Sequence, residues 1–193
     1  MLRVLLLVSF VAAAAAGQDD AIAWSSTRRL TWADFQGKAV NDLDGARSAV
    51  NTAMAVGCRE GVLQFRVVTQ FIPRQSFVTY RITSSGLASR AGIEHEQIHF
   101  DLAEVYARRI RKMYTELPAP CPRFDEALGA MADRFLRELA SIQRRYETET
   151  RSGENGARQA DWSKRVAADL TALDAFKDSG SRELAGRQGF EPR

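Results

Sequence analysis

Two histidines four residues apart, with a glutamate beside the first, are the residues of this sequence best suited to chemistry. They are the only histidines of the chain and stand in the run His95-Glu96-Gln97-Ile98-His99. On a helix, His95 and His99 project from one face, one turn apart, and can bind a single ion. Zinc suits neutral imidazole ligands and leaves a position open for water in catalytic sites. The spacing therefore predicts a Zn²⁺ site with His95 and His99 as ligands.

Glu96 lies one step round the helix from His95 and is the predicted catalytic residue. A carboxylate at this place is the usual general base for a water molecule whose pKa zinc lowers toward about 7. Such a water attacks a carbonyl, so the motif indicates hydrolysis of a peptide bond. The alternative is a pair of hydrogen-bonded core histidines without a metal.

A catalytic zinc usually has a third protein ligand, and the next helix along the chain offers two. Glu149 follows Tyr146 by three residues and extends the apolar stripe of that helix, which makes it our first choice. Glu147, about 100° further round, is the second choice, and both are alternatively solvated charges near a helix end. The Tyr146 hydroxyl is a candidate for stabilising an oxyanion, although we favour a packed core tyrosine.

Apolar residues at helical spacing define the elements that would hold this site. The motif helix is expected from residue 88 to about residue 117, where prolines at 118, 120 and 122 break the pattern. A second apolar stripe runs from Leu128 to Tyr146, and a weaker helix is expected over residues 159–176.

Strand-like segments precede the helices. They are expected at residues 21–24, 30–32 and 76–82, and as a hairpin of 48–56 with 62–71 around the polar turn at 59–61. Strands followed by helices, without alternation, indicate an α+β fold. We therefore expect a small antiparallel sheet followed by a helical, zincin-like metal-binding subdomain.

The ends of the 193-residue chain differ from its middle. Arg3, an apolar run at 4–11 and five alanines at 12–16 have the order of a secretory signal peptide, expected over residues 1–17. One domain is expected over 18–177, and the polar, Gly-containing segment 178–193 is expected to be a disordered tail. The mature protein is thus expected to be secreted or periplasmic.

Export favours a disulfide between the two cysteines, Cys58 and Cys121. Closing that loop would stabilise the fold by about 4 kcal/mol; two buried free thiols are the alternative. The formal net charge of +3 is spread without a basic stripe, so no nucleic-acid partner is expected. No later apolar run predicts stable membrane insertion. The expected partner is a protein or peptide substrate in the envelope or outside the cell.

Several longer motifs resemble a bacterial family, the domain of unknown function 922, described as predicted secreted zinc-dependent proteases. They are Trp24, Leu30-Thr31-Trp32-Ala33-Asp34-Phe35-Gln36-Gly37, the run from His95 to Arg108, Tyr146-Glu147-Thr148-Glu149-Thr150, and then Asn155, Gln159 and Trp162. The family's Tyr-Asp-x-Glu-Thr-x-His segment has a histidine where this chain has Ser152, and an aspartate where it has Glu147. The resemblance implies the fold and the metal, with Glu149, Glu147 or a water as third ligand.

Two functions are therefore expected as alternatives. The first is a secreted or periplasmic zinc-dependent metallopeptidase, a hydrolase in which Glu96 assists a zinc-bound water. The second is a non-catalytic envelope binding protein that retains a degenerate or structural metal site. The reason to consider it is Ser152, which stands where the resembling family has a histidine.

Overall fold

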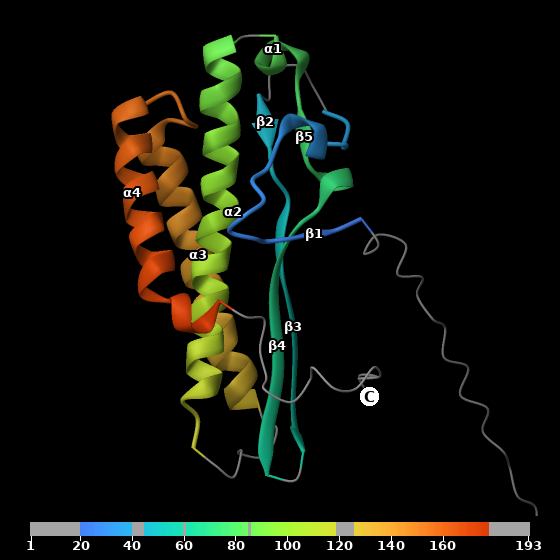
Figure 1. Ribbon diagram of the computed structural model, residues 1–193, viewed down its shortest axis with the longest axis vertical. Coiled ribbons are helices and arrows are strands. Elements are labelled where there is room, and N and C mark those ends of the chain that lie inside the picture. Colours follow the sequence, from blue (N-terminus) through green and yellow to red (C-terminus); the bar gives the residue numbers. More distant parts are fainter. Residues whose placement is uncertain (1–19, 40–44, 60, 85, 119–125, 178–193) are drawn as a thin grey trace, which may run out of the picture.

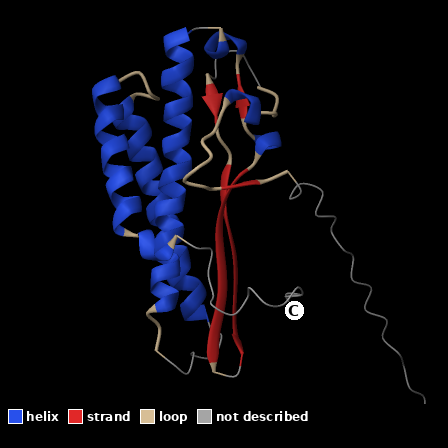
Figure 2. Cartoon of the chain, in the orientation of Figure 1, coloured by secondary structure: helices blue, strands red, loops and turns tan. Residues whose placement is uncertain are grey.

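The computed structural model describes residues 20–39, 45–59, 61–84, 86–118 and 126–177. In the described part of the chain, three long helices stand together on one side of a long β-ribbon, and short elements gather near one end of it (Figure 1). Figure 2 shows the same division between helices and strands. This mixed α/β architecture with a small antiparallel sheet confirms the coarse fold class. The expected signal peptide and C-terminal tail lie outside the described residues.

The ribbon is the predicted hairpin. Strand β3 (Val50–Arg59) pairs antiparallel with β4 (Val62–Phe71) along its whole length, from Val50 opposite Phe71 to Arg59 opposite Val62. Gly61 in the turn has a φ of 79°, a left-handed conformation that glycine adopts without steric cost. The two-residue strand β1 (Ile22–Ala23) pairs with the other edge of β4.

Two expected strands were wrong in part. Within 76–82 only β5 (Phe77–Val78) is extended, paired with β2 (Ala46–Arg47), and the chain then forms α1 (Tyr80–Thr83). Tyr80 is 84% exposed, so the alternating pattern around it did not mark a buried face.

The segment expected as a strand at 30–32 runs into a 3₁₀ turn, η1 (Trp32–Asp34). The Asp34 carboxylate accepts a hydrogen bond from the Thr31 N–H at 2.8 Å, which favours a local turn over a strand ladder. A second 3₁₀ turn, η2 (Pro73–Gln75), follows β4.

The helices are α2 (Gly86–Thr115), α3 (Glu126–Thr150) and α4 (Gly156–Ala172), followed by the 3₁₀ turn η3 (Asp174–Phe176). The α4 helix begins earlier than expected because Asn155 caps it, its side chain accepting from the Arg158 N–H at 3.2 Å. Among the described residues, no helix is long and apolar enough to cross a membrane.

The core lies on both sides of α2. Between α2, β4 and α3, a cluster of buried side chains comprises Phe65, Val67, Ala107, Ile110, Tyr114 and Ala132. Between α2, α3 and α4, a second cluster comprises Ile98, Leu102, Val105, Tyr106, Tyr146, Trp162 and Val166. A third, near β1 and η1, comprises Leu30, Phe35, Phe71 and Phe100. The central helix is therefore apolar on several faces, and its polar side chains need partners.

A buried ion network fixes the rotation of α2 against β4. Glu104, 2% exposed, accepts from Arg108 Nε at 2.9 Å and from Arg111 Nη1 at 2.8 Å. Its other oxygen accepts from the Thr69 hydroxyl at 2.9 Å, and Arg111 Nη2 donates to the Val67 carbonyl oxygen at 2.8 Å. Because buried charges cost free energy unless paired, these contacts hold α2 in one orientation about its axis. The histidine face is thereby turned toward α3.

The segment that carries the Leu-Thr-Trp-x-Asp-Phe-x-Gly pattern packs over the first half of α2. Leu30 N–H donates to Gln97 Oε1 at 2.7 Å, and the Phe35 ring packs against the Phe71 ring. Gly37 N–H donates to Ser76 O at 2.7 Å, and a Cβ at position 37 would lie 2.8 Å from that oxygen. Only glycine fits so close an approach.

Only one of the two cysteines of the expected disulfide lies among the described residues. Cys58 lies in β3 and is not a free cysteine. Cys121 lies outside the described residues, so the pairing stays a prediction.

Candidate metal centre

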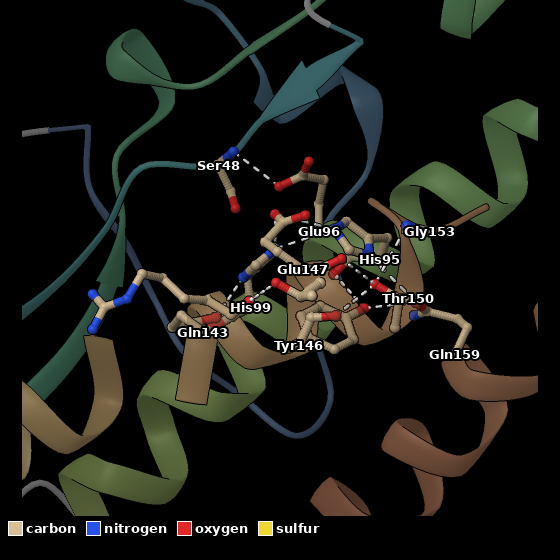
Figure 3. A network of polar contacts seen from close by, with 12 residues as sticks. Ser48, His95, Glu96, His99, Gln143, Tyr146, Glu147, Thr150, Gly153 and Gln159 are labelled. Atoms are coloured by element: carbon tan, nitrogen blue, oxygen red, sulfur yellow. Dashed lines mark hydrogen bonds and ion pairs between the residues drawn. The ribbon is translucent and has the colours of Figure 1, made fainter. Parts of the chain in front are cut away.

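Two histidines from α2 and one glutamate from α3 bring three potential ligand atoms together (Figure 3). The two Nε2 atoms, of His95 and His99, lie 3.2 Å apart. Glu147 Oε1 lies 3.4 Å from His95 Nε2 and 2.8 Å from His99 Nε2. His95 is buried, whereas the Glu147 side chain is 43% exposed, so the group opens to solvent on the α3 side.

The spacing of these atoms fits a tetrahedral metal ion. Zinc bonds of about 2.0–2.1 Å to nitrogen or oxygen place neighbouring ligand atoms about 3.3 Å apart. The three observed separations, 3.2, 3.4 and 2.8 Å, lie around that value. Two imidazoles and one carboxylate are also a ligand set that zinc accepts. The group could therefore hold a metal ion, with one position left for water or substrate.

A glutamine side chain meets the far nitrogen of each imidazole. Gln143 Oε1, from α3, is in close contact with His99 Nδ1, and the same amide donates from Nε2 to the His99 carbonyl oxygen at 2.9 Å. Gln159 Oε1, from α4, lies 3.3 Å from His95 Nδ1. An oxygen there accepts an N–H from Nδ1, so a neutral imidazole presents the bare Nε2 to the ion. These glutamines orient both rings.

The sequence motifs did not single out Gln143 for this role. A usable signal was present, because Gln143 and Glu147 are four residues apart on α3, as the two histidines are on α2. Two such pairs on facing helices can meet side by side.

Tyr146 supports the site from beneath, and its position does not support an oxyanion role. Its ring stacks on the His95 ring at 4.7 Å, with 18° between the planes, and is fully buried. The hydroxyl donates to Gln159 Oε1 at 2.8 Å and lies 3.2 Å from the His95 carbonyl oxygen. Burial raises the pKa of this phenol well above its usual range. The favoured interpretation as a packed core tyrosine agrees with this placement.

Glu149, the first choice for third ligand, is not in the group; the structure places Glu147 there. Glu149 Oε2 accepts from Trp162 Nε1 at 2.9 Å, and Oε1 pairs with Arg145 Nε at 2.7 Å. The physical reason is that α3 packs against two helices. Its broad apolar stripe is shared between α2 and α4, and Glu149 lies on the α4 side while Glu147 lies on the α2 side.

The turn after α3 closes over His95. Arg151, Ser152 and Gly153 all have positive φ values, of 51°, 54° and 87°. A Cβ on Gly153 would lie 3.3 Å from the His95 side chain, so this turn packs tightly on the imidazole. Ser152, which replaces the histidine of the resembling family, is exposed within this turn and is absent from the described metal group.

Glu96 is buried beside the group and is held from the opposite direction. Its Oε2 accepts from the Ser48 N–H, between β2 and β3, at 2.9 Å (Figure 3). The side chain is thus fixed by the sheet, whereas the histidines are fixed by α3 and α4. The contact with the backbone of Ser48 was not expected from the sequence.

The charges of the site act on one another. Hydrogen bonds from His95 and His99 hold the pKa of the Glu147 carboxyl well below its usual range. Burial lowers the pKa of His99, but the hydrogen bond to Glu147 and the negative charge of Glu96 outweigh it and raise that pKa overall. The Glu147 carboxylate is therefore ionised where it faces the two imidazoles.

Three potential ligand atoms from two adjacent helices form a group that could hold a metal ion. Residues 88–154 match a family described as "Bacterial protein of unknown function (DUF922)", which supports the resemblance to that family. The match covers both histidines, Glu96 and Glu147, and ends before Gln159. No curated protein and no solved structure matches the chain.

Proposed function

We propose that this chain is a zinc-dependent metallopeptidase with a zincin-like helical subdomain. The observation that carries the proposal is the convergence of His95 Nε2, His99 Nε2 and Glu147 Oε1, next to a buried glutamate on the same helix turn. Two imidazoles and one carboxylate are the ligand class of hydrolytic zinc sites with an open position. The glutamate within the histidine spacing is the general base of that class.

The chain's own residues supply the remaining parts of hydrolysis. Zinc bound here supplies Lewis acidity toward water and a peptide carbonyl. Glu96 takes the proton of the attacking water and returns it to the leaving amine, so that it is unchanged after a turnover. Gln143 and Gln159 keep the two imidazoles oriented, and a peptide would approach from the side of Glu147, whose side chain is 43% exposed.

We also propose that the protein acts in the periplasm or outside the cell. The support is the order of charged, apolar and small residues over 1–17 in the sequence. A hydrolase of this class would there act on envelope or extracellular peptides and proteins.

A binding protein without turnover is the rival function, and one observation favours it. Ser152 stands where the resembling family has a histidine, and the turn that carries it packs against His95. Such a protein would use the metal to hold α2 against α3 and would leave Glu96 without a catalytic task.

Metal analysis combined with a peptide assay tests the proposal. We expect about one zinc per chain in the purified protein and none in the His95→Ala/His99→Ala variant. Glu96→Gln should keep the zinc and lose at least about a hundredfold in hydrolysis of a quenched fluorescent peptide library. Glu94→Gln, an exposed glutamate on the same helix, is the matched control and should keep full activity.

Three results would contradict the catalytic proposal in different ways. Equal activity of the parent and the Glu96→Gln variant would refute the role of Glu96 as general base. Zinc in both proteins without hydrolysis in either would favour the binding protein. No zinc in the parent, even after zinc is added back, would refute the metal site itself.

A further inference from the structure

A cleft lies on the side of α2 that faces away from the metal group. Gln97 and Asp101 follow His95 and His99 by two residues each, and therefore point about 200° away from them on the helix. They line a cleft of about 320 Å³ between the segment after β1, α2 and α4. Nothing in the proposed peptidase mechanism uses this cleft.

Two buried charges of opposite sign are among its lining residues. Asp101 is 8% exposed and Arg108 is 3% exposed. Both hydrogen bonds to Asp101, from Trp24 Nε1 and Gln97 Nε2, end on Oδ1 at 2.8 Å. Arg108 donates through Nε to Glu104 and through Nη1 to the Leu170 carbonyl oxygen. Within the described residues, no hydrogen bond reaches Asp101 Oδ2 or Arg108 Nη2.

The rim repeats the same pattern of charge. Arg29 and Asp174 line the cleft, as do the hydroxyl-bearing side chains Ser25, Ser163 and Thr171. The lining therefore holds two cations and two anions, and Arg108 Nη1 lies 3.9 Å from Asp174 Oδ1. The Trp24 ring packs on the Arg108 guanidinium at 5.1 Å.

We propose that this cleft binds a small zwitterion of the size of a dipeptide, with its carboxylate toward the arginines and its ammonium group toward Asp101. A ligand of one sign would place like charges together, which costs free energy in a partly buried site. A zwitterion satisfies both, and buried polar groups reject analogues that leave them unpaired. The volume is at the lower end of the range for small-molecule sites, which suits two residues.

Calorimetric titration with the dipeptide alanyl-alanine tests the proposal. The chain used carries His95→Ala/His99→Ala, so that neither metal nor hydrolysis contributes to the heat. We expect saturable binding that is at least tenfold weaker for N-acetyl-alanyl-alanine and for alanyl-alanine amide, each of which lacks one charge. Equal heats for all three, or none with alanyl-alanine at millimolar concentration, would refute a zwitterion site.

Neighbouring arginines offer a matched pair of variants. Arg29 lines the cleft, whereas Arg28 pairs with Asp34 at 2.6 Å and does not. Arg29→Gln should weaken alanyl-alanine binding at least tenfold and Arg28→Gln less than twofold. Asp101→Asn, which keeps the Oδ1 acceptor, should weaken it to a similar extent as Arg29→Gln, at an unchanged melting temperature. Equal effects of Arg28→Gln and Arg29→Gln would place the ligand elsewhere. Failure here leaves the metallopeptidase proposal intact, because none of the residues that line the cleft belongs to the metal group.

Discussion

Two glutamates of α3, Glu147 and Glu149, should differ sharply in their effect on zinc affinity. Glu147 offers a potential ligand atom 2.8 Å from His99 Nε2, whereas Glu149 accepts a hydrogen bond from Trp162 Nε1 at 2.9 Å. Removing each carboxylate in turn, as Glu147→Ala and Glu149→Ala, therefore separates metal binding from helix packing within a single turn of helix.

The size of the zinc effect follows from the number of ligands. Zinc binding to four protein ligands is worth about 10–16 kcal/mol at neutral pH, or about 3 kcal/mol for each ligand. Loss of Glu147 should therefore weaken zinc binding on the order of a hundredfold. Glu149→Ala should leave zinc affinity within about twofold and lower the urea midpoint, because the buried Trp162 N–H loses its acceptor.

Competition with a chromophoric chelator measures the zinc affinity, and urea unfolding of the metal-free proteins measures stability. Glu147→Gln serves as a second variant that keeps the side-chain volume and should also bind zinc more weakly. A hundredfold loss in Glu149→Ala, with Glu147→Ala near the parent, would refute the assignment of the third ligand. Equal losses in both would mean that α3 as a whole has moved.

Further substitutions test the supports of the site. Gln159→Leu should weaken zinc binding about 10- to 100-fold without abolishing folding, because His95 loses the partner of its Nδ1; unchanged affinity in the chelator assay would contradict that support. Glu104→Gln should destabilise the chain by about 3 kcal/mol in urea unfolding, since two buried guanidinium groups lose their carboxylate. Gly153→Ala should destabilise it by about 1–2 kcal/mol, because its φ is 87°. Gly156→Ala, which has open space, should not; equal effects would contradict the strained turn.

The hairpin and the motif helix could be predicted because each has one strong, long-range pattern. Residues 62–71 were expected as a strand and form β4 over that range. The helix expected over 88–117 is α2, which begins and ends two residues earlier than expected. Short elements failed where local hydrogen bonds decided the outcome, as at Thr31 and Asp34.

Side-chain partners across elements were harder to predict than elements. The helical stripe of α3 pointed to Glu149 because its period cannot say which of two neighbouring helices a residue faces. The answer depends on how α3 sits between α2 and α4, which is a tertiary property. Gln159 is among the residues of the family resemblance, but the sequence alone assigned it no role. Its contact with His95 becomes visible only when the position of α4 is known.

The residues around the imidazoles come from three helices that lie far apart along the chain. Glu147 follows His99 by 48 residues, and Gln159 follows His95 by 64. An extended chain offers zinc only the two histidines, because closing so long a loop costs entropy that a single ligand bond must first overcome. Tight zinc uptake should therefore come late, after α2 and α3 have docked. The rate at which bound zinc becomes resistant to a chelator would then measure the rate at which these helices assemble.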